Sequence, residues 1–468
     1  MGDTQRSPTI SPEHQRIAEQ TVPNNVGTLT DSERDKPPAL AGQTSLEWIR
    51  MQARKDPSLV FTSLAHMIRF DLLKRSFRNV RRSKSCGVDG ITAAKYAENL
   101  DTNLYNLQQR LRRGQYVAQP VQRIWIDKEG GKKRPIGISA LEDKIVQKAV
   151  VKILDVVYGW NFYGFSHGFR EGHSQHMALH ELREQCRKQN INWIIDADVC
   201  GFFDNIDKKL LMSLIKRRVN DGGLLRLIGK WLKAGIDEGG ELSYPEKGTP
   251  QGAVISPVLS NIFFHYVLDD WFIKVVQPKL GCRSFLVRFA DDFIIGCELE
   301  TDAERVLALL EERFDCFSLK LHPEKTKLIP FGKPASRLRV DKRNGTFDFL
   351  GFTFYWSRAR KGYWVVKKKT IGTRLNRFVK TIWEWCRDNR HAPLREQHCD
   401  LSQKLYGYYQ YYGVRGNFKA LEVVFEHTEK AWRYWLSRRS HKGGINWAKF
   451  EKIRASLPLP KPRIIHSI

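Results

Sequence analysis

The spacing of apolar residues divides most of the chain into helical and β-type segments. From Leu46 to about Phe77, apolar side chains recur at helical spacing among Arg and Lys, which predicts an amphipathic helical opening to the folded part. Residues 116–138 change to a β pattern around Glu129-Gly130-Gly131, so we expect a hairpin there. Residues 142–157 return to helical periodicity.

Two further β-type segments carry acidic residues. Residues 192–199 are typical of a mostly buried strand and end close to Asp198, and residues 284–297 predict a hairpin with Asp291 and Asp292 at its middle. Thr301-Asp302-Ala303-Glu304 has the form of a capping box and predicts the start of a helix. Strands, hairpins and helices that alternate in this way predict an α/β (α+β) sheet domain.

A composition shift near Ser357 indicates a second domain, mostly helical, aromatic and basic. Residues 358–380 hold nine Lys or Arg and no acid, which we interpret as positive charge at helical spacing. Such charge suits RNA phosphates, whereas the Tyr- and Trp-rich stretch from Tyr406 to Trp435 is assigned mainly to a packed core. The expected RNA contacts are Arg358, Arg360, Lys361, Lys367, Lys368, Lys369, Arg374 and Arg377.

Charge and composition narrow the class of partner. The chain has 78 Lys and Arg against 51 Asp and Glu, a net charge of +27, so we expect a nucleic-acid partner. None of the eight cysteines forms a C-x-x-C pair, which suggests reduced thiols and neither a zinc knuckle nor a disulfide framework. No apolar run approaches the ~20 residues that span a bilayer, and no signal pattern is present. We therefore expect a cytoplasmic protein without a membrane partner.

The first 45 residues differ from the rest. They hold six acidic residues, four basic residues, five prolines and few large apolar side chains, which predicts a disordered N-terminal tail.

Asp198, Asp291 and Asp292 are the strongest candidates for chemistry. An unpaired charge at the edge of an apolar strand is costly, and a bound cation removes that cost. Antiparallel pairing could bring the three carboxylates together, and oxygen ligands of this kind suit two Mg²⁺ ions that support phosphoryl transfer. An isolated Asp-Asp pair is more often a turn or a solvated face, so the surrounding sequence has to decide.

The loop at residues 248–257 lies between these acidic segments. Its two glycines would allow the backbone to approach a ligand closely, and Gln251 could offer a donor and an acceptor to a nucleotide. The alternative is an ordinary loop before a helix that begins near Pro257.

The order of short motifs resembles one known family. The sequence blocks of group II intron reverse transcriptases are matched, in order and spacing, by residues 87–92 (GVDGIT), 132–138 (KKRPIGI), 166–170 (SHGFR), 198–204 (DVCGFFD), 248–257 (GTPQGAVISP), 289–292 (FADD) and 349–352 (FLGF). Residues 405–417 (LYGYYQYYGVRGN) resemble the maturase-specific domain of that family. The resemblance covers roughly residues 46–445.

The resemblance implies a right-hand polymerase fold. Fingers and palm with an antiparallel sheet would occupy residues 46–355, and a helical thumb or maturase domain that binds RNA would occupy residues 356–445. Residues 446–468 would form a short basic tail with no endonuclease domain, so DNA nicking is not expected.

The resemblance also assigns roles to single residues. Asp198, Asp291 and Asp292 would be the catalytic, metal-binding triad, with the backbone carbonyl of Val199 as a further ligand. Two Mg²⁺ ions would be bound, and Mn²⁺ could substitute. Phe203 would close the sugar 2′ position, with core packing as its alternative role.

Further residues would contact substrates. Lys128 and Arg134 would grip the triphosphate of the incoming dNTP, Gln251 would lie against the nascent pair, and Arg170 would lie in the template-facing palm or fingers. The chain departs from the family pattern at Phe289, where Tyr is usual, and at Asp127, where Pro is common.

The function that follows is RNA-directed DNA synthesis, coupled to binding of the group II intron RNA to assist splicing and mobility. The partners would be an RNA template, the intron RNA, a DNA primer or target, and dNTPs. One alternative is a splicing maturase with a vestigial polymerase, which the intact acidic triad opposes. Another is a reverse transcriptase of a defence or diversification system, which should lack the Tyr-rich segment.

Overall fold

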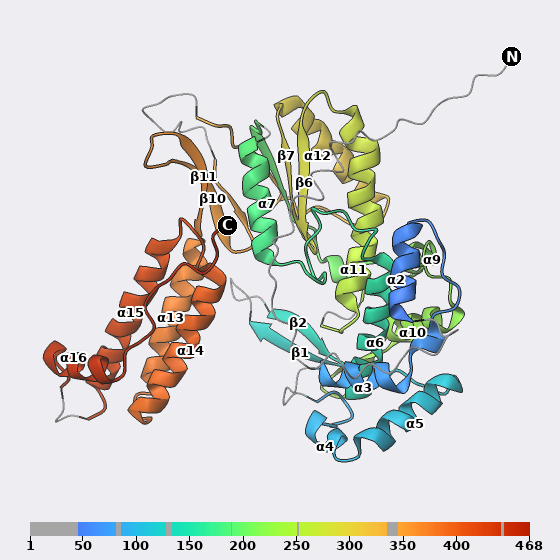
Figure 1. Cartoon of the computed structure of the whole chain (residues 1–468), viewed down its shortest axis with the longest axis horizontal. Helices are drawn as coiled ribbons and strands as arrows, with labels where there is room; N and C mark the ends of the chain where they lie inside the picture. The colour runs from blue at the N-terminus through green and yellow to red at the C-terminus, as the bar shows by residue number, and fades with distance from the viewer. Residues whose placement is uncertain are drawn as a thin grey trace. The chain divides into compact units, whose positions relative to one another are not determined.

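The computed structural model describes residues 45–80, 86–127, 133–188, 190–249, 252–334, 345–440 and 444–468, apart from the side chain of Asp127 (Figure 1). Residues 45–468 form one compact unit. The predicted N-terminal tail lies outside the described residues except for Ser45, and so do Lys128 and Gln251.

The predicted helical opening consists of separate helices. Helix α2 spans Leu46–Lys55 and α3 spans Phe70–Arg78, with the short 3-10 helix η2 (Ala65–Met67) between them. The break falls at Asp56, whose backbone is extended, because the residue before a proline avoids the helical region. Helices α4 (Ala93–Ala97), α5 (Leu100–Arg112) and α6 (Leu141–Tyr158) follow.

The predicted hairpin at residues 116–138 is confirmed. Strand β1 (Val121–Asp127) pairs antiparallel with β2 (Lys133–Ile138). Strands β4 (Ile236–Glu238) and β5 (Glu241–Ser243) complete a sheet of order β2-β1-β4-β5, in which β1 and β4 are parallel.

A second sheet, of order β6-β7-β3-β8, carries the acidic segments, and the strand at residues 192–199 and the hairpin at 284–297 are confirmed. Its strands are β3 (Trp193–Ala197), β6 (Ser284–Phe289), β7 (Asp292–Cys297) and β8 (Lys327–Pro330), and the pairs β6–β7, β7–β3 and β3–β8 are antiparallel. Alternate residues enter different cores: Ile195 packs in the cluster that includes α12, and Ile194 in the cluster that includes α7.

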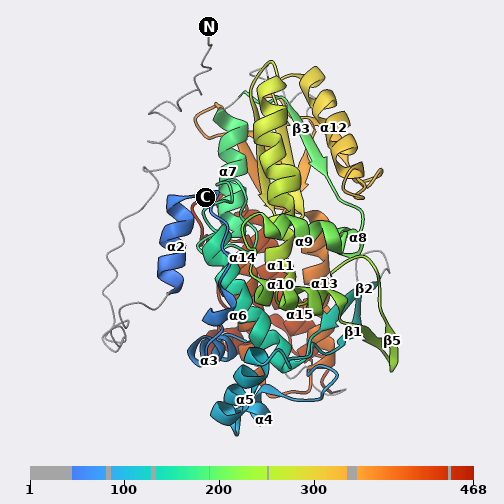
Figure 2. The same ribbon diagram turned by 90° about the vertical axis from the view of Figure 1, so that its right-hand side faces the viewer.

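Helix α7 spans Gln175–Lys188 and helix α12 spans Glu300–Asp315. Helix α12 runs beside the second sheet (Figure 2). The predicted capping box is wrong, because α12 begins one residue before Thr301 and its cap, Leu299, makes no side-chain cap hydrogen bond. The remaining elements of this region are α8 (Phe202–Asn205), α9 (Lys208–Lys216), α10 (Gly222–Lys233), α11 (Ser256–Phe264), the π-helical turns η4 (His265–Asp269) and η5 (Phe272–Val276), and η6 (Gln277–Lys279).

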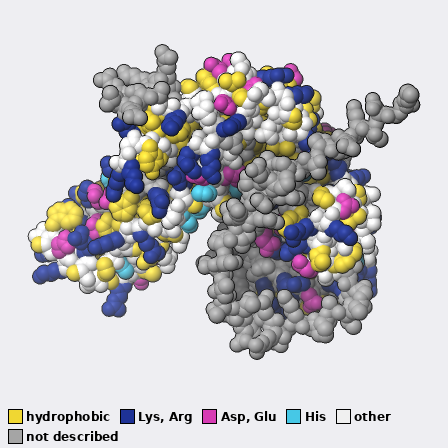
Figure 3. Space-filling view, turned by 45° about the horizontal axis from the view of Figure 1, so that its top comes forward, with side chains coloured by type: hydrophobic (Ala, Val, Ile, Leu, Met, Phe, Trp, Pro, Cys, Tyr) yellow, Lys and Arg dark blue, Asp and Glu magenta, His cyan; other side chains and the backbone are white. Residues whose placement is uncertain are grey.

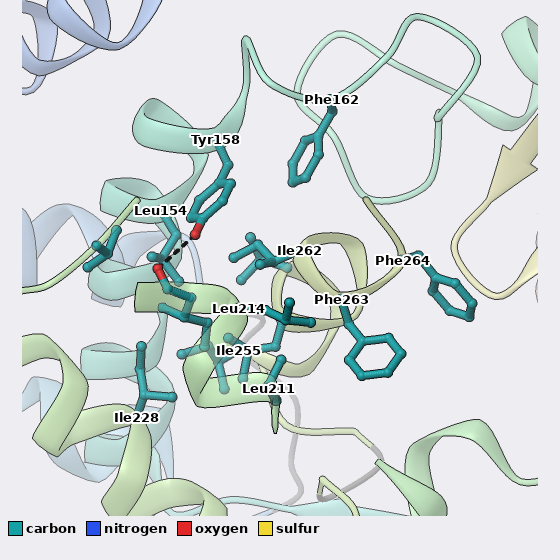
Figure 4. Close-up of a cluster of buried hydrophobic side chains, with 14 of the residues drawn as sticks. Leu154, Tyr158, Phe162, Leu211, Leu214, Ile228, Ile255, Ile262, Phe263 and Phe264 are labelled. Carbon is teal, nitrogen blue, oxygen red and sulfur yellow. Dashed lines mark hydrogen bonds between the residues drawn. The ribbon is translucent and has the colours of Figure 1, made fainter. Parts of the chain in front are cut away.

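The largest core joins α6, α9, α10 and α11. Figure 4 shows Leu154, Leu211, Ile228 and Ile262 converging in this core, where each is fully buried. Burial of such a side chain stabilises the fold by about 1.5–3 kcal/mol. Tyr158 is also buried there, and its hydroxyl donates to a backbone carbonyl of α9 at 2.9 Å. The acidic sheet therefore rests on a close-packed base.

The basic region differs from its prediction in part. Residues 358–370, expected at helical spacing, belong to a β-hairpin in which β10 (Phe352–Arg358) pairs with β11 (Trp364–Thr370) and with β9 (Phe347–Phe349). The burial alternates with period two along β11: Val366 and Thr370 are buried and Lys369 is exposed, as a strand requires. The helices α13 (Gly372–Asp388), α14 (Leu394–Tyr412), α15 (Phe418–Leu436) and α16 (Trp447–Ser456) follow.

One apolar cluster connects the second sheet to this basic region. Phe352, Phe354 and Trp356 of β10 pack in the same cluster as Leu179 of α7 and Val287 of β6. Strand β10 runs through residue 355, where the sequence-based boundary was set.

The segment after α16 returns to the end of α14. The amide of Ile465 donates to the carbonyl of Gly413 at 2.7 Å, and Val414 forms a β-bridge with His466. The ring of His466 stacks on His176 of α7 with ring centres 3.7 Å apart.

Candidate active site

Strand pairing brings the predicted acidic residues to one end of the second sheet. In the β3–β7 register Ala197 is the partner of Phe293, so the chains leave the sheet with Asp198 and Asp292 as the next opposed positions. Asp291 precedes β7 directly. Because side chains alternate along a strand, Asp196 lies on the same face as Asp198. The 93 positions between Asp198 and Asp291 are thus bridged by the sheet.

These carboxylates influence one another electrostatically. Burial, followed by the neighbouring charges of Asp196, Asp291 and Asp198, raises the pKa of Asp292 to about 7, against the lowering effect of Arg374. Burial, followed by the charge of Asp348, raises the pKa of Asp196 to about 7 as well. A cluster of this kind stabilises negative charge poorly by itself and gains from a divalent cation.

The charges of Asp291 and Arg134 also influence each other. Burial of its carboxyl raises the pKa of Asp291, although the residue as a whole reaches solvent, and the charge of Arg134 lowers it. Arg134 is exposed on β2 of the first sheet. The hairpin therefore presents a guanidinium close to the acidic residues, and the triphosphate contact assigned to Arg134 stays a prediction.

Asp198 contacts a lysine that sequence reasoning missed. Its carboxylate forms an ion pair with Lys325 at 2.5 Å. Both side chains are about half exposed, 46% for Asp198 and 54% for Lys325. The backbone carbonyl of Asp198 accepts from the His322 amide at 2.7 Å, and Val199 forms a β-bridge with Leu321. The loop at 320–326 therefore fixes the end of β3.

The donor set suits a hard divalent cation, because carboxylate oxygens are the ligands that Mg²⁺ prefers. Within the described ranges, however, no three His, Cys, Asp or Glu side chains stand close enough to hold one ion. The contact with Lys325 occupies an oxygen of Asp198 that a cation would use. Lys325 and a cation would compete for that oxygen.

The glycines at 248 and 252 serve a different purpose from the predicted one. A Cβ at Gly248 would lie 2.8 Å from the carbonyl oxygen of Phe203, and a Cβ at Gly252 would lie 2.7 Å from the carbonyl oxygen of Gly137. The Thr249 amide also donates to the Phe203 carbonyl at 2.7 Å. The close approach is thus to the protein's own backbone, and no ligand is needed to explain the two glycines.

Phe203 is held beside this loop. Its ring is partly buried and meets Phe202 edge-on, with ring centres 5.2 Å apart. Both roles considered for Phe203, the sugar gate and core packing, are compatible with this position, so the gate stays a prediction.

Arg170 contacts the protein's own backbone. Its guanidinium donates to the backbone carbonyls of Tyr163 (2.6 Å) and Ser166 (2.5 Å), and at longer range to those of Gly159 and Phe162. Four carbonyls bound in this way close the loop between α6 and α7. The expected location of Arg170 in the template-facing palm or fingers stays a prediction.

Most of the predicted RNA contacts are accessible. Arg358, Arg360, Lys361, Lys369, Arg374 and Arg377 are exposed, and Lys367 is partly buried. Lys and Arg dominate the charged side chains on the face shown in Figure 3.

Lys368 is the exception, because it is only 1% exposed and its pKa is lowered to about 7 by burial and by Arg183. It lies on the inner side of β11, so we remove it from the RNA contacts. Among the aromatics, Tyr408, Tyr409 and Trp432 are buried, which confirms their assignment to a core.

Sequence reasoning missed three functional candidates, of which two had weak signals in the sequence. Asp196 lies two positions before Asp198, which on a strand means the same face. Arg288 is a single charge within the apolar strand Phe285-Leu286-Val287-Arg288-Phe289, and a buried charge of this kind needs a partner. Lys325 follows no pattern that separates it from other surface lysines.

None of the described helices combines the length and the apolar character needed to cross a membrane.

Known proteins resemble the chain over most of the region described above. A family described as reverse transcriptase (RNA-dependent DNA polymerase) matches residues 126–354. Protein YkfC of Escherichia coli (strain K12) is 30% identical over 347 residues, which is 66% of this chain and 87% of YkfC. Group II intron-encoded protein LtrA of Lactococcus lactis subsp. cremoris is 33% identical over 293 residues, 61% of this chain. The chain belongs to the group II intron reverse transcriptase family.

Family membership confirms the predicted right-hand polymerase fold with its helical C-terminal region. A further relative, the putative COX1/OXI3 intron 1 protein of Saccharomyces cerevisiae, is 31% identical over 258 residues, 54% of this chain and 30% of that protein. The chain spans 47% of the length of LtrA, so this reverse transcriptase corresponds to only part of that relative.

Proposed function

We propose that this reverse transcriptase extends a primer on an RNA template by nucleotidyl transfer at Asp198, Asp291 and Asp292. The observation that supports the proposal is that strand pairing brings these residues to one end of the β6-β7-β3-β8 sheet, where burial and then the neighbouring negative charges raise the pKa of Asp292. In the reaction the primer 3′-hydroxyl attacks the α-phosphorus of a dNTP, a new P–O bond forms, and the bond to pyrophosphate breaks.

The three aspartates, with the backbone carbonyl of Val199, would hold two Mg²⁺ ions, or Mn²⁺ in their place. The ions would activate the attacking hydroxyl and neutralise the charge on the leaving pyrophosphate. Arg134 and Lys128 would bind the triphosphate, Phe203 would close the sugar 2′ position, and Gln251 would lie against the nascent pair.

The exposed basic side chains would bind RNA. Arg358, Arg360 and Lys361 lie in and after β10, Lys367 and Lys369 on β11, and Arg374 and Arg377 on α13. They could contact phosphates of the template, of the intron RNA during splicing, or of a DNA target. LtrA is named as an intron-encoded protein, and we propose the same association for this chain.

Primer extension on an RNA template with Mg²⁺ and dNTPs tests the polymerase. We expect wild-type synthesis and a loss of about 10³-fold or more in the Asp291→Ala variant, because an oxygen ligand of the metal pair is removed. Asp388→Ala is a matched control, because Asp388 is a solvent-exposed aspartate on α13 with a 60% exposed side chain.

Unchanged synthesis by Asp291→Ala would contradict the assignment. If the wild type binds RNA tightly and synthesises no DNA, the vestigial-polymerase alternative is favoured.

A further inference from the structure

The turn that carries Asp291 and Asp292 has an unfavourable backbone conformation. Ala290 adopts a left-handed conformation with φ +62°, which a residue with a Cβ seldom takes up. Gly168 lies so close to this turn that a Cβ there would overlap the backbone nitrogen of Ala290. The surrounding structure must therefore hold the turn in place.

Arg288, two residues before Ala290, is in position to do this. Its side chain is 0% exposed and forms an ion pair with Asp269, also 0% exposed. Nε donates to Oδ1 of Asp269 at 2.8 Å and Nη2 to Oδ2 at 2.5 Å. The Nη1 group donates to the carbonyl oxygen of Ala290 at 2.8 Å, directly on the strained residue.

The remaining donors of Arg288 reach two other segments. Nη2 donates to Oγ of Ser166 at 2.6 Å and Nη1 to Oδ1 of Asn261 at 3.1 Å. All five N–H groups of the guanidinium are thus used. The amide nitrogen of Asn261 in turn donates to the carbonyl of Gly168 at 2.6 Å, which fixes the segment packed against Ala290.

Stability alone does not account for this arrangement. A buried ion pair is often no more stabilising than apolar residues of similar volume, because two charges must be removed from water. A planar guanidinium fork, in contrast, specifies the direction of several acceptors at once, which neither a lysine nor an apolar side chain can do. What the pair provides beyond packing is the orientation of the Ala290 carbonyl.

We propose that Arg288 and Asp269 are positioning residues that hold the 289–292 turn in the conformation that directs Asp291 and Asp292 toward the reacting phosphate. The inference rests on the proposed polymerase function for its catalytic part. Neither residue touches substrate; both act through Ala290.

The double variant Arg288→Met/Asp269→Leu separates positioning from stability, because it replaces the charged pair with apolar groups of similar volume. The matched control is Arg454→Met/Glu429→Leu, which removes an ion pair of 3.1 Å between α16 and α15. Arg288→Lys keeps the charge next to Asp269 but cannot reach all four partners, and it serves if the double variant does not fold. Each variant is measured by urea unfolding, by kcat and KM for dNTP, and by hydrogen exchange of peptides that cover 289–292.

We expect folded variants in which kcat falls by ~100-fold for the double variant, the loss that a small misplacement of catalytic groups produces, while KM for dNTP changes little. Arg288→Lys should show a smaller loss in kcat. Exchange at 289–292 should increase in both, and the control should match the wild type in all three measurements.

Either of two results would overturn the inference. One is a stably folded double variant whose kcat equals that of the wild type, and the other is hydrogen exchange at 289–292 that does not change in the variants. If the wild type makes no DNA, the proposed function fails, and the exchange data still decide whether the pair holds the turn.

Discussion

Replacing Lys368 with methionine should stabilise the protein, and the gain should depend on pH. The side chain is 1% exposed, and its Nζ has no hydrogen-bond partner among the described residues. Burial and then the nearby charge of Arg183 lower the pKa of Lys368 from 10.5 to about 7. At about 1.4 kcal/mol per pKa unit, that difference corresponds to a cost of about 5 kcal/mol for keeping the amine charged in the folded protein. Because local relaxation lowers this cost, we expect a measured gain of roughly 2–5 kcal/mol.

The direction of the pH dependence follows from proton binding. Below pH 7 the amine is charged in both the folded and the unfolded chain, so the folded protein carries the whole cost of burying the charge. Between pH 7 and about 10.5 the folded state releases the proton while the unfolded state keeps it, and the cost shrinks. The stabilisation by Lys368→Met should therefore be largest at pH 7 and below and should approach zero near pH 10.5.

Urea unfolding at pH 6.5 and at pH 9.5 measures this. Lys369→Met is the matched control, because Lys369 is the next residue on β11 and points to the exposed side. The control should leave the free energy of unfolding within about 0.5 kcal/mol of wild type and weaken RNA binding, whereas Lys368→Met should leave RNA binding unchanged. Destabilisation by Lys368→Met at pH 6.5, or a difference that does not vary with pH, would refute the reasoning.

Three other substitutions give sharp expectations. Gly168→Ala should greatly reduce primer extension, because the added methyl overlaps the backbone of Ala290. Gly164→Ala should remain active, because a Cβ there meets nothing within 4 Å, and equal activity of the two variants would contradict the packing argument. Asp221→Ala should lower the free energy of unfolding in urea by about 2–4 kcal/mol, since its carboxylate caps α10 and also accepts two amides near η2; a loss below 1 kcal/mol would count against it. Arg374→Ala should weaken RNA binding and reduce the slope of log affinity against log salt by about 1, and an unchanged slope would show that Arg374 makes no phosphate contact.

The periodicity of apolar residues predicted much of the fold. It located the hairpin at residues 121–138 and the strands that carry Asp198 and Asp291, because period-two burial leaves a strong local pattern. The same reasoning missed the break of the first helix and the β-hairpin of the basic tract. In that tract consecutive lysines on one strand conceal the alternation that burial later shows.

Less of the candidate active site than of the fold could be predicted from the sequence. The three aspartates could be named because motif order fixed them, but Lys325 and Arg288 depend on which segments the fold brings together. Lys368 shows the same limit from the other side. It is a basic residue within a basic tract, and burial that only the tertiary structure supplies withdraws it from nucleic acid.

The apolar cluster that joins β10 to α7 has a practical consequence for dissecting the enzyme. A polymerase fragment that stops at residue 355 would end inside β10 and lose Trp356, Val366 and Val414 from the apolar cluster that also holds Val287 and Leu179. It would also leave β10 without its partner strand β11, and an unpaired strand edge promotes aggregation during expression. Attempts to separate DNA synthesis from RNA binding are better made by point substitution on the intact chain than by cutting it in two.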